Sequence, residues 1–158
     1  MTSPPNQYTQ PDPETLRARR AAIIAQASGD QLKQSWNELT LDPAFEHIRA
    51  PEIGLVALKG RIGGGGAAFP FSDATATRTS VRLESGHVGH AIVLGRDKAR
   101  ATIAAVVDAL CQSDDIAAEI DESLIDPLSK AIAANDLTLA SKAEATRVDF
   151  FTLVRGED

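Results

Sequence analysis

A run of glycines with an arginine just before it is the part of this chain best suited to bind an anion such as a phosphate. The run is Gly63–Gly66, and Arg61 precedes it. Glycine N–H groups can approach an anion closely, and an arginine can neutralise its charge. One hypothesis is therefore a module that binds a nucleotide or a similar anion, in which the following residues gather: Arg61, Gly63, Gly64, Gly66, Arg78, Arg96 and Lys98.

The glycine run lacks the features of a Walker phosphate loop. Such a loop needs Gly-Lys-Ser/Thr at the start of a helix, whereas this run leads into Ala67-Ala68-Phe69-Pro70-Phe71, which cannot start a helix cleanly. The alternative interpretation is a flexible connection, or a backbone that passes close to a partner protein. Both interpretations stay open at this point.

Cations also stand where a helix is expected to begin. The segment Gly95-Arg96-Asp97-Lys98 precedes a helical pattern, and cations at a helix N-terminus oppose the helix dipole. A bound phosphate or an acidic partner would remove this conflict, because free N–H groups, dipole and cations would all favour the same anion. In the plainer alternative, Asp97 caps the helix and the basic side chains extend into solvent.

The remaining reactive side chains form no visible catalytic or metal-binding set. His87 and His90 cannot point to the same face of a strand, and His47 is distant in the sequence. Cys111 lies on an apolar stripe and is expected to be a small core residue. We therefore expect no catalytic residue, no metal ligand and no bound cofactor on this chain.

The C-terminal stretch predicts contact with another protein. Phe150 and Phe151 stand side by side among β-forming residues almost at the end of the chain, where soluble proteins often fray. A strand there carries an aromatic ring on each face, so both faces need cover. Either the segment folds back as a strand of its own domain or a partner subunit buries it. The partner-contact candidates are Arg147, Phe150, Phe151 and Arg155.

Two-residue periodicity predicts an antiparallel sheet. Within residues 75–94, apolar or threonine side chains alternate with polar ones on either side of Ser85-Gly86, which indicates a β-hairpin. A two-residue turn would pair Leu83 with Val88, Val81 with His90, Thr79 with Ile92 and Thr77 with Leu94. We expect further strands at about 53–61 and at about 147–155.

Helical patterns around these strands predict an α+β fold, an antiparallel sheet packed against several helices. Residues 14–27 favour a helix, and Asp30 can cap a second one. A third helix, with an apolar stripe over residues 103–111, is expected to lie on the sheet. Asp126-Pro127 suits a helix start, and Asn135-Asp136 is expected to interrupt the last helix.

Length and composition favour one domain preceded by a flexible leader. The chain has 158 residues with 43% hydrophobic content, which suits a single core. Residues 1–13 are rich in proline and are expected to be disordered, which leaves 14–158 as one α+β domain. A formal net charge of -6 opposes binding to nucleic acid or an anionic membrane. With a single cysteine and no long apolar run, we expect a cytoplasmic protein.

Four separated blocks of residues occur in a fixed order. They are Arg-x-Gly-Gly-x-Gly from Arg61, Asp-Ala-Thr-x-Thr-Arg-x-x-Val-Arg-Leu from Asp73, Gly95-Arg96-Asp97-Lys98, and Val-Asp-Phe-Phe-Thr from Val148. In this order the chain resembles the PhnG family, the G subunit of the bacterial carbon–phosphorus lyase core complex, from about Trp36 to Gly156. It departs from the family pattern at Ser72, where a glycine is expected, and in Arg17-Ala18-Arg19-Arg20, which lacks an expected tryptophan.

The resemblance implies a role without an active site of the chain's own. The family belongs to phosphonate metabolism during phosphate starvation, and its G subunit acts with the H, I, J and L subunits in a hetero-oligomer. The resemblance implies an accessory subunit of a transferase, which makes α-D-ribose 1-methylphosphonate 5-triphosphate from ATP and methylphosphonate and releases adenine. ATP is then a substrate of the whole complex, and the metal and iron–sulfur sites are expected on partner subunits.

Overall fold

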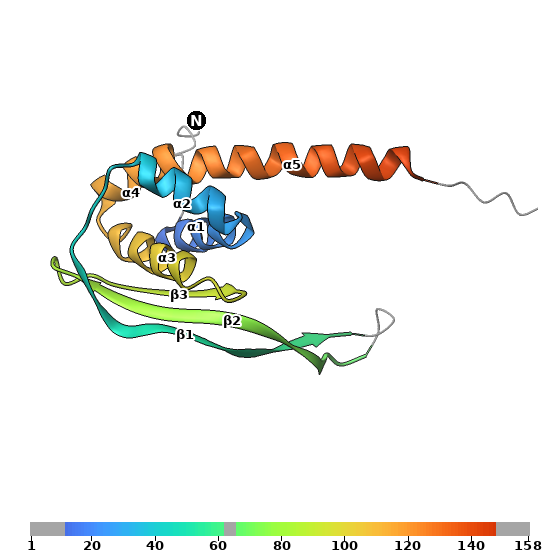
Figure 1. The fold of residues 1–158 in the computed structure, drawn as a ribbon, viewed down its shortest axis with the longest axis horizontal. Coiled ribbons are helices and arrows are strands. Elements are labelled where there is room, and N and C mark those ends of the chain that lie inside the picture. Colours follow the sequence, from blue (N-terminus) through green and yellow to red (C-terminus); the bar gives the residue numbers. More distant parts are fainter. Residues whose placement is uncertain (1–11, 62–65, 148–158) are drawn as a thin grey trace, which may run out of the picture.

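An antiparallel sheet lies beneath layers of helices in the computed structural model of the chain, which describes residues 12–61 and 66–147 (Figure 1). The sheet has three strands in the order β1-β2-β3, which are β1 (Phe45–Gly60), β2 (Phe69–Leu83) and β3 (Val88–Leu94). The helical segments are α1 (Pro13–Gln26), α2 (Gly29–Glu38), α3 (Lys98–Leu110), α4 (Asp114–Ile120), the π-helical turn η1 (Asp121–Ile125) and α5 (Asp126–Ala145). The predicted α+β class is confirmed.

Helix α3 lies directly on the sheet, as its apolar stripe predicts (Figure 1). Val107 of α3 and Val81 of β2 are both buried in the common core. The closest approach is at Gly89 of β3, where an added Cβ would collide with the carbonyl oxygen of Ala105 and lie 2.6 Å from the backbone nitrogen of Ala109. Only a residue without a side chain lets the helix pack this closely.

The predicted pairing of the hairpin is wrong by one residue. The N–H of Leu83 donates to the carbonyl of His87 at 2.9 Å, and Gly86 has a φ of 88°, so the turn is a three-residue loop. Ladder partners are therefore Thr77 with Val93, Thr79 with Ala91, and Val81 with Gly89. The predicted inward face of β2 is correct, but the slip turns every β3 side chain to the other face. Ile92 and Leu94 consequently point outward and are exposed.

The first strand is longer than the predicted 53–61. It begins at Phe45 and passes through Pro51, which precedes the predicted start. A proline cannot donate to a ladder, but β1 is an edge strand, and its register with β2 shifts between Arg49 and Glu52. An irregular edge strand tolerates proline where a central strand would not.

Two helix starts differ slightly from the predictions. Ser28, not Asp30, caps α2: its hydroxyl accepts the N–H of Gln31, and the Gln31 side chain accepts the N–H of Ser28, each at 3.2 Å. Helix α1 begins at Pro13, the last residue of the expected leader, because proline suits the first turn of a helix. Asp12 of that leader precedes the helix, and residues 1–11 lie outside the described residues.

The last helical stretch is continuous from α4 through η1 to the end of α5 at Ala145. Helix α5 begins at Asp126 with Pro127 in its first turn, as predicted, but Asp126 is not a cap because the backbone before it is already helical. Asn135-Asp136 does not interrupt the helix. The wider π turn just before Pro127 accommodates the residue that would otherwise clash with the preceding turn. None of the helices in the described ranges is long and apolar enough to cross a membrane. The strand predicted at about 147–155 falls outside the described residues, apart from Arg147.

Gly89→Ala tests the close contact between α3 and the sheet. Because backbone atoms of α3 must move to admit the new methyl group, we expect the free energy of unfolding to fall by about 1–3 kcal/mol. Gly54→Ala is the matched control, since an added Cβ there meets nothing within 4 Å. Urea denaturation followed by circular dichroism measures both, and an unchanged midpoint for Gly89→Ala would contradict the packing.

Candidate partner interface

The β1–β2 pair extends beyond β3 and beyond the helices that cover the sheet. Strand β3 ends at Leu94, opposite Ala76, whereas β2 begins seven residues earlier at Phe69, opposite Gly60. At about 3.4 Å per residue, the two-stranded extension is roughly 20 Å long. We call residues 53–60 of β1 and 69–75 of β2 the ribbon. It projects on the same side of the molecule as α5 (Figure 1).

The ribbon has apolar side chains on both of its faces. Ile53 and Leu55 lie opposite Thr77 and Thr75 and so share the face of the buried side of β2, because opposite residues of an antiparallel pair point the same way. Val56 and Leu58 alternate to the other face. The side chains of Leu55 and Phe71 are 71% and 60% exposed. A strand that is apolar on both faces is typical of one covered on both sides.

Exposure of these side chains is energetically costly. Fully burying one leucine, isoleucine or phenylalanine side chain stabilises a structure by about 1.5–3 kcal/mol, and an isolated two-stranded hairpin is marginal in water. Phe69 at the start of β2 adds another exposed ring. Within the part of the chain that the structure describes, nothing covers this surface, so the ribbon is the strongest candidate for contact with another protein.

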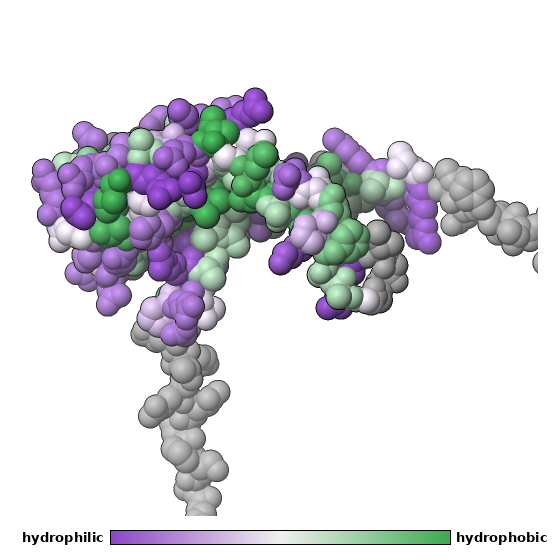
Figure 2. Space-filling view, turned by 90° about the horizontal axis from the view of Figure 1, so that it is seen from below, coloured by the Kyte–Doolittle hydropathy of each residue, from purple (hydrophilic) through white to green (hydrophobic). Residues whose placement is uncertain are grey.

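The outer face of the sheet is different at its wide end, where charged side chains pair across the strands. Arg82 donates to Glu46 at 3.0 Å, and Glu52 accepts from Arg78 at 3.3 Å and from Arg49 at 3.4 Å. Figure 2, seen from the sheet side, shows much hydrophilic surface over the wide part and apolar patches near the middle and along the projecting part. The wide end combines these charge pairs with the exposed side chains of Ile92 and Leu94, whereas the segment Ile53–Leu58 of the ribbon carries no charge.

The second half of α5 is also uncovered. Residues 133–145 are exposed throughout, including Leu137 at 73% and Leu139 at 55%. Short helices without tertiary contacts are marginal in water. The end of α5 is therefore a second element that a partner would stabilise.

The glycine part of the predicted anion site lies at the ribbon tip. Arg61 is exposed directly after β1, and Gly66, with a φ of 87°, is exposed shortly before β2. Gly63 and Gly64 lie outside the described residues. The tip therefore holds one of the four predicted cations.

The other three predicted cations lie elsewhere. Arg78 pairs with Glu52 on the outer face of the sheet. Arg96 and Lys98 are exposed just after β3, and the ladder register separates them from the ribbon tip by roughly 20 Å. The structure does not gather the set around one anion. A smaller site at Arg96 and Lys98 stays a prediction.

Asp97 occupies the N-terminus of α3, as the capping alternative predicts. Its carboxylate accepts the backbone N–H of Arg100 at 2.9 Å and the ammonium of Lys33 at 2.9 Å. These two contacts, the backbone bond first, lower the pKa of Asp97. The chain thus supplies its own anion at this helix N-terminus.

The predicted contact residues at the C-terminus are mostly outside the described ranges. Phe150, Phe151 and Arg155 lie there, so their role stays a prediction. Arg147 is described and exposed, and it donates to Glu144 at 3.4 Å.

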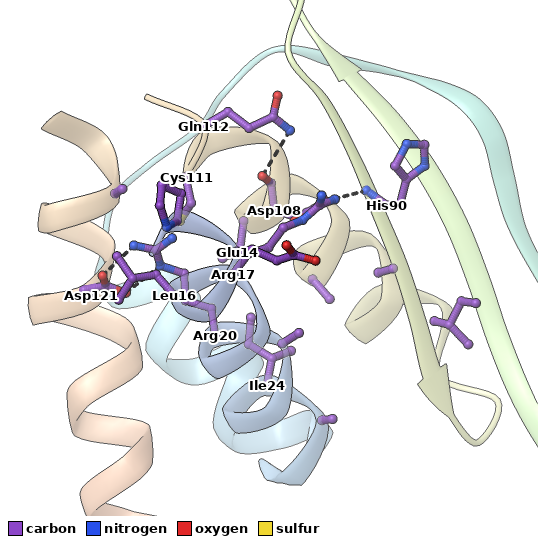
Figure 3. A pocket seen from close by; sticks show the side chains of 18 of the residues that line it. Glu14, Leu16, Arg17, Arg20, Ile24, His90, Asp108, Cys111, Gln112 and Asp121 are labelled. Carbon is purple, nitrogen blue, oxygen red and sulfur yellow. Dashed lines mark hydrogen bonds and ion pairs between the residues drawn. The ribbon is translucent and has the colours of Figure 1, made fainter. Parts of the chain in front are cut away.

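A cavity of about 1030 Å³ between α1, β3, α3 and η1 is a competing candidate (Figure 3). Arg17 donates to both carboxylate oxygens of Asp108, at 2.7 and 2.8 Å, and Arg20 does the same to Asp121, at 2.7 and 2.6 Å. These side-chain hydrogen bonds raise the pKa of both guanidinium groups. Because each cation has its own carboxylate, the arrangement fits a structural joint between helices better than a binding site.

Sequence reasoning missed these arginine pairs and a third one, between Arg19 and Asp126 at 2.7 Å. The partners lie 91 to 107 residues away along the chain, so no local spacing reveals them. The available signal was the run Arg17-Ala18-Arg19-Arg20 itself, three cations within one turn of a helix. Within the described ranges, no group of three or more His, Cys, Asp or Glu side chains is arranged to hold a metal ion.

Comparison with known proteins places the chain in a family. The model of the family described as phosphonate metabolism protein PhnG matches residues 15–156. This chain belongs to the PhnG family. A curated PhnG relative, the alpha-D-ribose 1-methylphosphonate 5-triphosphate synthase subunit PhnG of Rhizobium meliloti (strain 1021), is 45% identical over 136 residues, which cover 86% of either chain.

The residue blocks that resemble PhnG lie on or beside the sheet. Arg61 and Gly66, the described residues of the first block, are at the ribbon tip, the block from Asp73 runs along β2, and Gly95–Lys98 forms the turn before α3. None of these three blocks lines the cavity. The PhnG signature in the described chain therefore coincides with the ribbon and its base.

Alkylation of Cys111 tests the environment of the cavity wall. Burial raises the pKa of its thiol to about 11, although nearby Arg20 acts in the opposite direction. Because only the thiolate reacts, we expect iodoacetamide at pH 9 to modify the native chain at least about 30-fold more slowly than the urea-unfolded chain. The native rate should keep rising towards about pH 11. Mass spectrometry follows the reaction, and equal rates at pH 9 would contradict this environment.

Proposed function

We propose that this chain is an accessory subunit of the enzyme that makes α-D-ribose 1-methylphosphonate 5-triphosphate, within the carbon–phosphorus lyase core complex. The enzyme transfers the ribose 5-triphosphate part of ATP to methylphosphonate and releases adenine. Membership of the PhnG family and the name of the curated relative support the reaction. The exposed apolar ribbon supports a role exerted through contacts with partner subunits.

In this proposal the chain holds and shapes its partners and performs no chemical step. The cavity between α1 and α3 is lined by arginine–carboxylate pairs that satisfy one another, and its cysteine is held as a neutral thiol. ATP is a substrate of the whole complex, and the metal and iron–sulfur sites belong to partner subunits. The proposed partners are the H, I, J and L subunits, in the cytoplasm.

The alternative function is a nucleotide- or phosphonate-binding module. The exposed positions of Arg96 and Lys98 next to the start of α3 favour it. Calorimetry with ATP or methylphosphonate separates the two proposals. Binding by the isolated chain that is lost on Arg96→Ala would support the module, and no measurable heat would leave the accessory subunit ahead.

Leu55→Ser tests whether the ribbon is the contact surface. It removes a side chain that is 71% exposed, so we expect the isolated chain to keep its fold. In co-expression with the H, I and J subunits, the tagged variant should recover at least about tenfold less of them, as truncating a central interface residue typically does.

Ile92→Ser is the matched control for this experiment. Ile92 is 67% exposed and similar in size, but it lies on the outer face of β3, away from the ribbon. We expect normal recovery of the partner subunits with this variant. Normal recovery of the partner subunits with both Leu55→Ser and Phe71→Ser would show that the ribbon is not the contact surface, which would contradict the proposal.

A further inference from the structure

The free edge of β1 has two unlike halves. In the first half the register with β2 shifts between His47 and Arg49 and again between Arg49 and Glu52, and Pro51 interrupts the donors. Shifts and prolines of this kind protect edge strands from pairing with other chains. From Ile53 to Leu58 the register is unbroken, and the segment has no charge and no proline. This second half lacks every such protection.

Backbone groups in this half point away from the molecule at every second residue. Strand β2 bonds to β3 through its odd-numbered residues, as the bonds from Gly95 to Thr75 at 2.8 Å and from Leu83 to His87 at 2.9 Å show. Its even-numbered residues therefore bond to Gly54, Val56 and Leu58 of β1. The N–H and C=O groups of Ile53, Leu55 and Ala57 are consequently directed to the open edge.

The opposite edge of the sheet shows how the fold satisfies such groups. On β3 the carbonyl of Val88 accepts from the Gln112 side chain at 2.6 Å, and the N–H of His90 donates to Asp108 at 2.9 Å. Both partners are side chains at the C-terminal end of α3. Among the described residues, no side chain makes the corresponding contact with the edge at Ile53, Leu55 or Ala57.

Gly54 fits the close approach of another backbone. It is the second residue of the unprotected half, it has no positive φ that would require glycine, and an added Cβ would meet nothing within 4 Å. Glycine inside a strand often marks a place where another chain comes near.

Charge at the two ends of the edge favours a different protein over a second copy of this chain. Lys59 and Arg61 are exposed cations at the tip, whereas Glu52 at the other end already has Arg49 and Arg78 beside it. If two copies paired antiparallel through this edge, Lys59 and Arg61 of each copy would lie near the end of the edge where Arg49 and Arg78 of the other copy surround Glu52. A partner segment with a carboxylate at the tip end avoids the repulsion.

We propose that a partner subunit adds an extended strand to the β1 edge at Ile53–Leu58. This strand carries apolar side chains on both faces and an acidic residue that meets Lys59 and Arg61. The proposal rests on the proposed function, because it names how an assembly partner binds the ribbon. Backbone hydrogen bonds supply affinity and the side chains supply specificity, as in other cases of strand addition.

Residue-resolved hydrogen exchange tests the geometry in the assembled complex. We expect the amides of Ile53, Leu55 and Ala57 to exchange freely in the isolated chain and at least about tenfold more slowly in the complex. The amides of Gly54, Val56 and Leu58 should be protected in both states. Protection in the isolated chain that grows with its concentration would identify a second copy, and protection lost on deletion of residues 148–158 would identify the chain's own C-terminus. Either result overturns the proposal.

Ala57→Pro tests the edge itself. It removes an outward N–H and leaves the bonds of Val56 and Leu58 to β2 in place, while Ala57→Val is the control that keeps the donor. With circular dichroism confirming the fold, we expect at least about tenfold less recovery of partner subunits for Ala57→Pro and normal recovery for Ala57→Val. Normal recovery with Ala57→Pro, combined with loss in Leu55→Ser, would overturn strand addition but leave the accessory subunit intact. Normal recovery with both would remove the support for both proposals.

Charge reversal tests the chemistry of the partner strand. Lys59→Glu combined with Arg61→Glu should weaken assembly, and the loss should shrink as salt is raised because screening reduces the new repulsion. If the double variant associates with its partners at low salt as strongly as the unaltered chain, or more strongly, the partner strand has no acidic residue at this end.

Discussion

The pairing of β1 with β2 is longer than anything the chain provides to cover it, and this mismatch determines most of what the molecule can do. At one end the two strands, with β3 and α3, enclose a core around Val81 and Val107. At the other end the same ladder continues to Gly60 and Phe69 without a third strand or a helix. One continuous pair of strands is therefore both the floor of a domain and a projecting surface that needs a partner.

At the wide end, charged contacts join helices that are distant in the sequence, and these helices support the base of the ribbon. The arginines of α1 reach Asp108 of α3, Asp121 of η1 and Asp126 of α5. Arg100 donates to the carbonyl groups of Ile24 and Ala25, at 3.0 and 2.6 Å, at the C-terminal end of α1. Bidentate pairs of this kind are directional. They fix the helices against one another, and the helices in turn hold the sheet as a firm base for the ribbon.

How much the sequence predicts depends on whether a pattern is complete within one element. The alternation along Thr77, Thr79 and Val81 identifies β2 and its buried face without further information. The prediction for β3 assumed a two-residue turn, and a change of one residue in the turn exchanges the two faces of the strand. The loop has three residues, with Gly86 at a positive φ. The strand start at 53 and the helix start at Asp126-Pro127 were both predicted next to a proline. In the structure, edge strand β1 contains Pro51, and the π turn η1 lets the helix run on into Pro127. Neither the edge position nor the π turn can be recognised in the local sequence. The arginine pairs were hidden for the same reason.

The candidate surface shows a different limit. An apolar run such as Ile53–Leu58 indicates burial, and a strand was predicted there, but the sequence does not say whether the cover comes from the same chain. The interface prediction was placed on Phe150 and Phe151, beyond the described residues. The described chain carries the same physical signature, apolar on both faces and uncovered, at the ribbon. The predicted anion set likewise failed to converge, because Arg61 and Arg96 lie at opposite ends of the two-stranded extension.

The central claim is that the apolar side chains of the ribbon are buried from solvent only within an assembly of different subunits. Hydroxyl-radical footprinting of Phe69 and Phe71, in the isolated chain and in the co-expressed complex, tests it most directly. The account predicts that both rings are oxidised readily in the isolated chain and are strongly protected in the complex, while Ile92 reacts alike in both. Equal oxidation of Phe69 and Phe71 in the two states would contradict it.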